Sequence, residues 1–188
     1  FISTGINNTA IGNATMQGIT GNKLTGAYNT GVGDNALYKL QGSANGNTAI
    51  GYQSLYEGTT IANSTAVGTY SQYWTTGSPN TAVGTLTMTY VSTGTNNTAV
   101  GYSALTSLTG NKLTGSYNSA VGDSALANAE GAAGGNTAMG ANALKFNSTG
   151  GSNTSVGAYA MQGITGTRLT GNSNTAVGNS ALSLAQGT

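Results

Sequence analysis

The chain has 188 residues, only 5% of them are charged, and its formal net charge is +1. Soluble globular domains carry about 25% charged residues, and disordered chains usually combine low hydrophobicity with a high net charge, so this composition fits neither class. Cysteine and histidine are both absent, which excludes disulfides, thiolate metal sites and the most common general base of enzymes.

The five basic residues are scattered along the chain, without the cationic cluster that binding to nucleic-acid phosphates requires. No run of 18 apolar residues occurs, so we expect no membrane span in this stretch. The chain begins at Phe1 without a signal-like segment, which suggests a fragment of a longer fibrous protein. We treat residues 1–188 as a single repeat domain.

A nine-residue phrase recurs ten times, and its clearest copies read Asn-Thr-Ala-Val-Gly-x-x-Ala-Leu. Each copy is anchored by one glycine, and successive anchors are 21, 18, 17, 16, 17, 21, 18, 17 and 21 residues apart. A unit this short cannot bury an apolar face alone and must stack on further copies. The anchor glycines are Gly12, Gly33, Gly51, Gly68, Gly84, Gly101, Gly122, Gly140, Gly157 and Gly178.

Each copy begins with a predicted β-strand that occupies positions −4 to −1 relative to its anchor glycine. In chain order these strands are residues 8–11, 29–32, 47–50, 64–67, 80–83, 97–100, 118–121, 136–139, 153–156 and 174–177. Thr at position −3 and a Val-class residue at −1 favour a strand and share one face. We expect the residues at −1 to form the core ladder: Ile11, Val32, Ile50, Val67, Val83, Val100, Val121, Met139, Val156 and Val177.

After the glycine, which marks a bend, a small residue at position +3 and Leu or Met at +4 predict a second short strand. The remaining residues of each copy are rich in Gly, Ser, Thr and Asn, as loops are. Each copy therefore predicts one coil of an all-β, parallel β-roll or β-solenoid with about ten coils. At about 4.8 Å per coil the rod is about 50 Å long.

Position −4 is Asn in nine copies and Ser64 in the other. Stacked Asn side chains can pass amide hydrogen bonds from coil to coil. Asn at this position can equally begin a turn through a bond from its side chain to the backbone. The two interpretations are compatible, and the sequence leaves both open.

The core of such a rod is thin, because each coil supplies only one Val-class residue, one Leu-class residue and some alanines. Ordering about 17 residues costs roughly 1.5 kcal/mol each, whereas burying two such side chains contributes only about 3–6 kcal/mol. We therefore expect several chains to associate along a shared apolar axis, most simply as a homotrimer.

The three 21-residue spacings arise from longer loops, each with a basic residue eleven positions after its anchor: Lys23, Lys112 and Arg168. The segments 20–37 and 109–126 lie 89 residues apart and agree at 14 of 18 positions. A cation on a projecting loop can contact a ligand, or it can be a solvated charge that aids solubility. The sequence does not decide between these interpretations.

The fourth copy is irregular, because Gln72 replaces the Leu of position +4 and Tyr70, Tyr73 and Trp74 cluster beside it. Exposed aromatic rings among Asn and Thr can stack on sugar rings, which predicts a receptor patch. The alternative is that the aromatic side chains fill the core where the regular Leu is missing.

The phrases from Asn97 to Leu105 and from Asn174 to Leu182 resemble the head repeats of trimeric autotransporter adhesins. They are more similar still to repeats of bacteriophage tail and neck fibre proteins. The resemblance covers essentially the whole chain, and it implies a parallel β-roll in which three chains lie side by side with apolar positions meeting inside. The spacing departs from the adhesin heads, whose phrase recurs every fourteen or so residues.

No catalytic, metal or cofactor constellation is expected from the four acidic residues, so the chain is not predicted to be an enzyme. We expect a structural fibre segment, on a virion or cell surface, that positions host- or surface-recognition elements. One alternative is a bacterial trimeric adhesin that binds matrix or carbohydrate itself. Another is an ice-binding solenoid, for which ranks of Thr would have to face outward.

Overall fold

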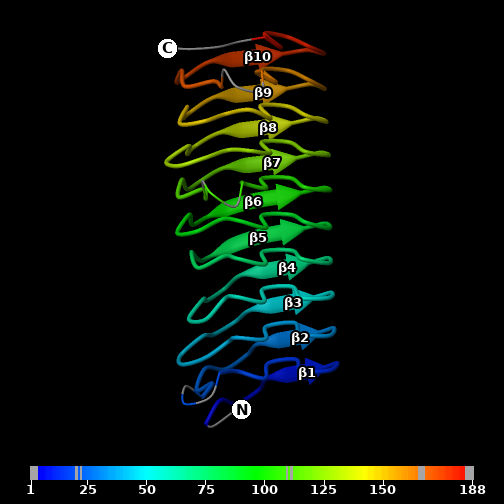
Figure 1. Ribbon diagram of the computed structural model, residues 1–188, viewed down its shortest axis with the longest axis vertical. Coiled ribbons are helices and arrows are strands. Elements are labelled where there is room, and N and C mark those ends of the chain that lie inside the picture. The colour runs from blue at the N-terminus through cyan, green and yellow to red at the C-terminus, as the bar shows by residue number, and fades with distance from the viewer. Residues whose placement is uncertain are drawn as a thin grey trace.

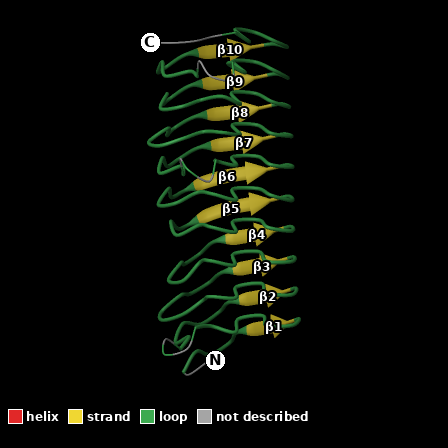
Figure 2. Cartoon of the chain, in the orientation of Figure 1, coloured by secondary structure: helices red, strands yellow, loops and turns green. Residues whose placement is uncertain are grey.

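The computed structural model describes residues 4–19, 21, 23–108, 110, 112–164 and 168–184. Its ten strands are parallel, follow one another in chain order within a single sheet, and belong to successive coils of a β-solenoid (Figure 1). Turns and loops form the rest of each coil (Figure 2). The strands are β1 (Thr9–Ile11), β2 (Thr30–Val32), β3 (Thr48–Ile50), β4 (Thr65–Val67), β5 (Asn80–Val83), β6 (Asn97–Val100), β7 (Ser119–Val121), β8 (Thr137–Met139), β9 (Thr154–Val156) and β10 (Thr175–Val177).

Equivalent positions of neighbouring copies lie opposite each other along the whole sheet. Between β5 and β6, for example, Thr81 pairs with Thr98 and Val83 pairs with Val100. The same register holds from β1 to β10, although the loops between strands differ in length. The predicted all-β solenoid with stacked repeats is therefore confirmed.

The anchor glycine adopts a backbone conformation that other residues rarely reach. At Gly101 φ is +131°, and a Cβ built there would lie 2.5 Å from the carbonyl oxygen of Gly122 in the next coil. Both the positive φ and the close approach of the next coil require a residue without a side chain. The glycine thus permits the tight stacking of one coil on the next.

The segment after the glycine is a turn, and the predicted second strand is wrong for the described residues. Positions +2 and +4 both have positive φ, as at Ser103 (51°) and Leu105 (54°). This conformation directs their amide groups along the rod: the Ser103 N–H donates to Thr85 in the preceding coil, and the Leu105 N–H donates to Ala125 in the following coil. The turn therefore continues the coil-to-coil hydrogen bonding that the strand begins.

The interior of each coil is lined by small side chains from the strand and by Leu or Met from the turn. Alanines at position −2, such as Ala82 and Ala99, are fully buried, as is Leu105 at position +4. Further apolar side chains, Leu113 among them, come from the return segment that closes the coil.

The expected position of the core ladder is wrong, because its side chains lie on the outer face of the sheet. Val83, Val100 and Val121 are each 39% exposed, and Met139 is 46% exposed. Alternation along a strand forces positions −4 and −2 inward once −3 and −1 face outward. The return segment passes close behind the sheet, and only Ala-sized side chains and Asn fit there. The residues of this column are Ile11, Val32, Ile50, Val67, Val83, Val100, Val121, Met139, Val156 and Val177, and they do stack in register.

The asparagines at position −4 form a ladder of amide hydrogen bonds from coil to coil, as the first of the two interpretations of this position predicts. Asn118 Nδ2 donates to Asn97 Oδ1 at 3.0 Å and to the Ala133 carbonyl at 2.9 Å. Its Oδ1 accepts the backbone N–H and the Nδ2 of Asn136, at 3.0 and 3.1 Å. Each such side chain thus joins neighbouring coils and also ties the strand to the return segment.

At the irregular fourth copy, Gln72 itself occupies the interior position that Leu holds elsewhere. It is fully buried, and its Nε2 donates to the Thr65 carbonyl at 2.7 Å and to the Asn80 carbonyl at 3.2 Å. The prediction that neighbouring aromatic side chains fill this place is wrong, because Tyr73 is only partly buried and Trp74 is exposed.

Candidate functional site

The outer face of the sheet presents two straight columns of side chains, and we call this surface the Thr–Val face. One column is the Val-class residue at position −1, and the other is the residue at −3, two positions earlier on the same side of the strand. No charged residue belongs to either column. The second column consists of Thr9, Thr30, Thr48, Thr65, Thr81, Thr98, Ser119, Thr137, Thr154 and Thr175.

The Thr–Val face is continuous because the strands are in register and every loop leaves the sheet at its ends. An apolar side chain of the Val column therefore recurs at each coil, about every 4.8 Å. Continuous exposed apolar surface of this kind marks an interaction site more often than scattered exposed residues do.

Six aromatic side chains of three successive coils form a second surface, which we call the aromatic cluster. Tyr38, Tyr56 and Tyr73 stack face to face, with ring centroids 4.9 and 5.0 Å apart. The rings of Tyr70 and Trp74 each pack edge-to-face with the ring of Tyr73, with centroid separations of 5.6 and 5.8 Å. Tyr52 and Tyr70 pack in the same way, with their ring centroids 5.4 Å apart. The sequence predicted the grouping of Tyr70, Tyr73 and Trp74. It missed the stacked column, although Tyr38, Tyr56 and Tyr73 all lie five positions after an anchor glycine.

The stacking of these aromatic rings on one another covers ring faces on which a sugar would have to stack. Tyr56 is covered on both faces by Tyr38 and Tyr73, and the ammonium group of Lys112 lies 4.7 Å from the ring centroid of Trp74.

Burial raises the pKa of Tyr73 above 10.0, with smaller contributions from the charges of Tyr56 and Glu57. The pKa of Tyr52 is raised mainly by the charge of Tyr70.

The three basic residues of the long loops lie at three heights of the rod and do not form one site. Lys112 reaches Trp74, which belongs to the coil two before its own. Arg168 likewise reaches back two coils, where it forms an ion pair with Glu130 and donates to the Asn128 carbonyl at 3.3 Å. The Lys23 carbonyl accepts the Gly42 N–H at 3.1 Å, whereas its ammonium group has no ion-pair partner among the described residues. Their predicted contact with a ligand stays a prediction.

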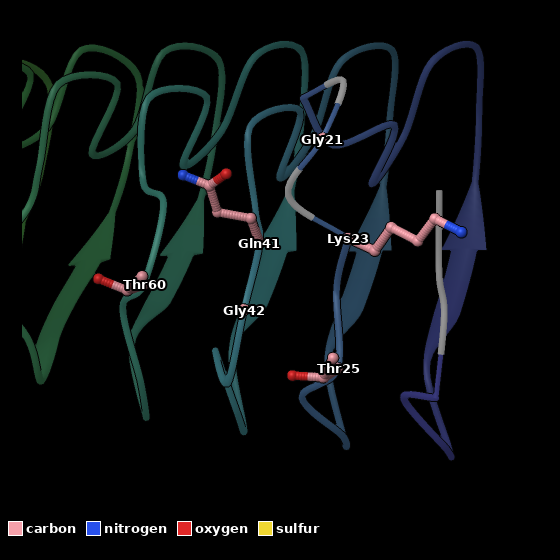
Figure 3. A pocket seen from close by; sticks show the side chains of 6 residues that line it. All are labelled: Gly21, Lys23, Thr25, Gln41, Gly42 and Thr60. Atoms are coloured by element: carbon pink, nitrogen blue, oxygen red, sulfur yellow. The ribbon is translucent and has the colours of Figure 1, made fainter.

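Two equivalent hollows accompany the long loops of the duplicated segments. The first, of about 440 Å³, is lined by Gly21, Lys23, Thr25, Gln41, Gly42 and Thr60. Its side chains do not converge, because Lys23 extends toward the β1 end of the rod while Gln41 and Thr60 extend the other way (Figure 3). The second, of about 410 Å³, includes Lys112 and Glu130, which are engaged by Trp74 and Arg168. In neither hollow do the polar side chains converge on one point where a ligand could bind.

Within the part of the chain that the structure describes, no three His, Cys, Asp or Glu side chains are grouped as metal ligands. Over the same residues, no helix has the length and apolar character needed to cross a bilayer. The two extended surfaces, the Thr–Val face and the aromatic cluster, are therefore the features that a function can use.

The comparisons with known proteins give no match. No family model, no curated protein and no solved structure matches this chain. Its function has to be argued from its own surfaces.

Proposed function

We propose that the chain is a structural fibre segment, the shaft of a phage tail or neck fibre, that holds a recognition element away from a virion. The observation that carries the proposal is the unbroken register of ten strands along one rod. Each coil hydrogen-bonds to the next through strand, turn and asparagine side chain. Such a rod resists bending because every coil is fixed to its neighbours at several places around its circumference.

The rod associates with copies of itself through the Thr–Val face, as a homotrimer. Covering a Val that is 39% exposed contributes roughly 0.5–1 kcal/mol for each coil. Ten coils add up to roughly 5–10 kcal/mol per chain before the cost of association. Three such faces around one axis would bury the Val columns together, which supplies the burial that a single thin rod lacks.

Native mass spectrometry and sedimentation of the purified chain test this proposal. We expect a trimer, and a chain that stays monomeric at micromolar concentration contradicts self-association. The variant V83K/V100K places two charges on the Thr–Val face and should dissociate the assembly. The matched control T93K/T114K adds the same charge at exposed positions outside the strands and should leave it intact.

Ice binding is the second candidate, and one specific observation favours it. The Thr column faces outward in register, as an ice-binding solenoid requires, whereas a Thr column turned inward would have excluded this function. Thermal hysteresis of the chain, abolished by T98Y in the middle of the face, would establish ice binding. A trimer without thermal hysteresis supports the fibre instead.

A further inference from the structure

Two residues flank the Thr–Val face in every coil: one at position −5, where the chain enters the strand, and one at position +1, just after the anchor glycine. We call these positions the entry edge and the exit edge. In two coils they carry a tyrosine and an aspartate: Tyr28 and Asp34 flank β2, and Tyr117 and Asp123 flank β7. Because the strands run across the long axis of the rod (Figure 1), the two residues of a pair lie at nearly the same height and at opposite edges of the face.

The two tyrosines are the most exposed aromatic residues that the structure describes, at 65% and 70%. Their φ angles of 60° and 62° lie in a region that bulky residues rarely adopt. The next coil has glycine at the entry edge in both cases, Gly46 and Gly135, so it contributes no side chain beside the ring. A large exposed side chain on a strained backbone is characteristic of a contact with another molecule.

The two aspartates keep acceptor capacity that the described residues do not use. Both are exposed; Asp34 accepts the Asn13 N–H at 3.2 Å, and Asp123 accepts the Ser124 hydroxyl at 2.7 Å. Neither forms an ion pair with another described residue. A carboxylate can accept about four hydrogen bonds, and one from a phenol O–H is charge-assisted and therefore strong. The tyrosines and aspartates are thus matched donors and acceptors.

The width of the Thr–Val face fits a ring of three chains. From the entry edge to the exit edge the chain advances six residues, about 20 Å when extended. Three faces of this width, turned toward one axis, form a triangular prism in which each sheet lies about 6 Å from the axis. This is close to half of the roughly 10 Å that separates packed sheets. The Val columns can therefore meet along the axis while the edges of neighbouring faces meet at the corners.

At each corner of such a ring, the entry edge of one copy meets the exit edge of the next. This follows because the strands of all copies run in the same sense around the axis of a closed ring. A closed ring also involves no displacement along its axis, so equal coils lie at equal heights.

We propose that Tyr28 and Tyr117 of one copy bind Asp34 and Asp123 of the next copy at these corners. Each phenol O–H donates to the carboxylate at the same height, and the ring of the tyrosine covers the corner. This inference rests on the proposed self-association, for which it supplies the contacts that set the alignment of the copies.

These contacts specify one alignment. The Val column repeats at every coil, so by itself it allows shifts of about 4.8 Å. A shift of one coil moves Tyr117 from Asp123 to a position without a carboxylate, Tyr102 or Ala141. A shift of five coils keeps only one of the two pairs at each corner. Only the unshifted arrangement forms both pairs.

Engineered disulfides test the corner contact, since the chain has no cysteine of its own. In Y117C/D123C the two positions of one chain are about 20 Å apart, well beyond the roughly 7 Å between Cα atoms that a disulfide tolerates. Mild oxidation of the assembly should therefore link neighbouring chains only and give a closed covalent trimer on denaturing electrophoresis. Y28C/D34C should do the same, and Y117C chains mixed with D123C chains should cross-link.

Three results of these cross-linking experiments overturn the inference. A covalent species that ends at the dimer excludes the ring of three. A disulfide in Y117C alone places two entry edges together. A disulfide between Y117C and D34C chains, mixed before oxidation, shows a shift of five coils.

A double-mutant cycle tests the hydrogen bonds themselves. Y28F/Y117F and D34A/D123A should each weaken association by roughly tenfold. The four substitutions together should weaken it little further, because both sets of changes remove the same bonds. The control Y159F removes the hydroxyl of an exposed tyrosine that lies at neither edge and should have little effect. Losses that add up in the combined variant contradict the pairing.

Sedimentation of the unmodified chain separates failure of this inference from failure of the proposed function. A chain that stays monomeric contradicts both. A trimer that yields neither the disulfides nor the non-additive losses contradicts the corner contact alone.

Discussion

At the scale of single residues, Asn118 uses all of its side-chain hydrogen-bonding capacity inside the rod. It donates twice and accepts twice, and its partners belong to the coil before, the coil after and the return segment. An apolar residue of the same size would leave those partners unpaired in a water-free interior, which costs more than the hydrogen bonds themselves contribute.

We expect N118A to lower the free energy of unfolding by about 2–4 kcal/mol, because the Ala133 carbonyl and the Asn136 N–H lose their partner. Chemical denaturation monitored by circular dichroism measures the change. The control N45A removes an exposed asparagine that accepts the Ala27 N–H and should cost less than about 1 kcal/mol. Equal effects of the two substitutions would show that the ladder has no special importance.

Single residues also show how far the sequence could predict this structure. The alternation of Thr98 and Val100 shows that they share a face, but it cannot show which face is inside. Hydrophobicity favours Val as the interior residue, and the prediction failed because the space inside the coil fits Ala99 and Asn97 instead. The positive φ of Leu105 could not be predicted from the sequence either, since leucine rarely adopts that conformation.

Other features could be predicted from the sequence because they repeat along it. The anchor glycines determined the coils, their spacing determined the pairing register, and the grouping of Tyr70, Tyr73 and Trp74 followed from their proximity in the sequence. The side on which Lys112 and Asp123 lie depends on the path of the return segment, which varies in length and carries no repeated signal. The candidate contact surfaces could therefore be predicted only in part.

At the scale of one coil, the anchor glycine allows the next coil to approach closely. G101A should lower the free energy of unfolding by about 3 kcal/mol or more, because its Cβ would lie 2.5 Å from the Gly122 carbonyl oxygen at a φ of +131°. G110A is the matched control, since a Cβ at Gly110 meets nothing within 4 Å. Thermal unfolding of both variants gives the comparison, and similar melting temperatures would refute the stacking argument.

The aromatic cluster links three coils and predicts a response to alkaline pH. Burial raises the pKa of Tyr73 above 10.0 in the folded state, so folding favours the neutral phenol. The contribution of Tyr73 to stability is fully present below the pKa of the unfolded chain and is lost as the pH rises through the folded-state pKa. Stability should therefore fall above about pH 10, and Y73F should reduce this fall.

Tyrosinate absorbance measured alongside denaturation checks the assignment. The folded chain should show tyrosines that ionise at higher pH than those of the unfolded chain. Y73F should remove part of this component and leave the part that comes from Tyr52, whose pKa is also raised. Y159F removes a tyrosine outside the aromatic cluster and should leave this component in place. Loss of the component in Y159F would show that Tyr73 is not its source.

At the scale of the whole molecule, the rod is a row of units in which the strand of each coil contacts the strands of its neighbours. Strand contacts join consecutive coils throughout, so stability is approximately a sum of coil and interface contributions. Coil length varies without disturbing the register, because extra residues are accommodated in the return segment. The proposed function as a shaft would use this property, since length can change while stiffness is retained.

Removal of one complete coil should therefore preserve the fold. Deleting residues 85–101 leaves Gly84 in the place of Gly101 and brings β5 directly before the turn that precedes β7. We expect a rod shorter by about 4.8 Å, with a single unfolding transition whose enthalpy is lower by about a tenth. Small-angle scattering and calorimetry measure these changes.

Deleting residues 85–93 removes only the turn half of the coil, so β6 would have no anchor turn before it. That shorter deletion should abolish cooperative unfolding. If it were tolerated as well as the complete coil, the coil would not be the unit from which the rod is built.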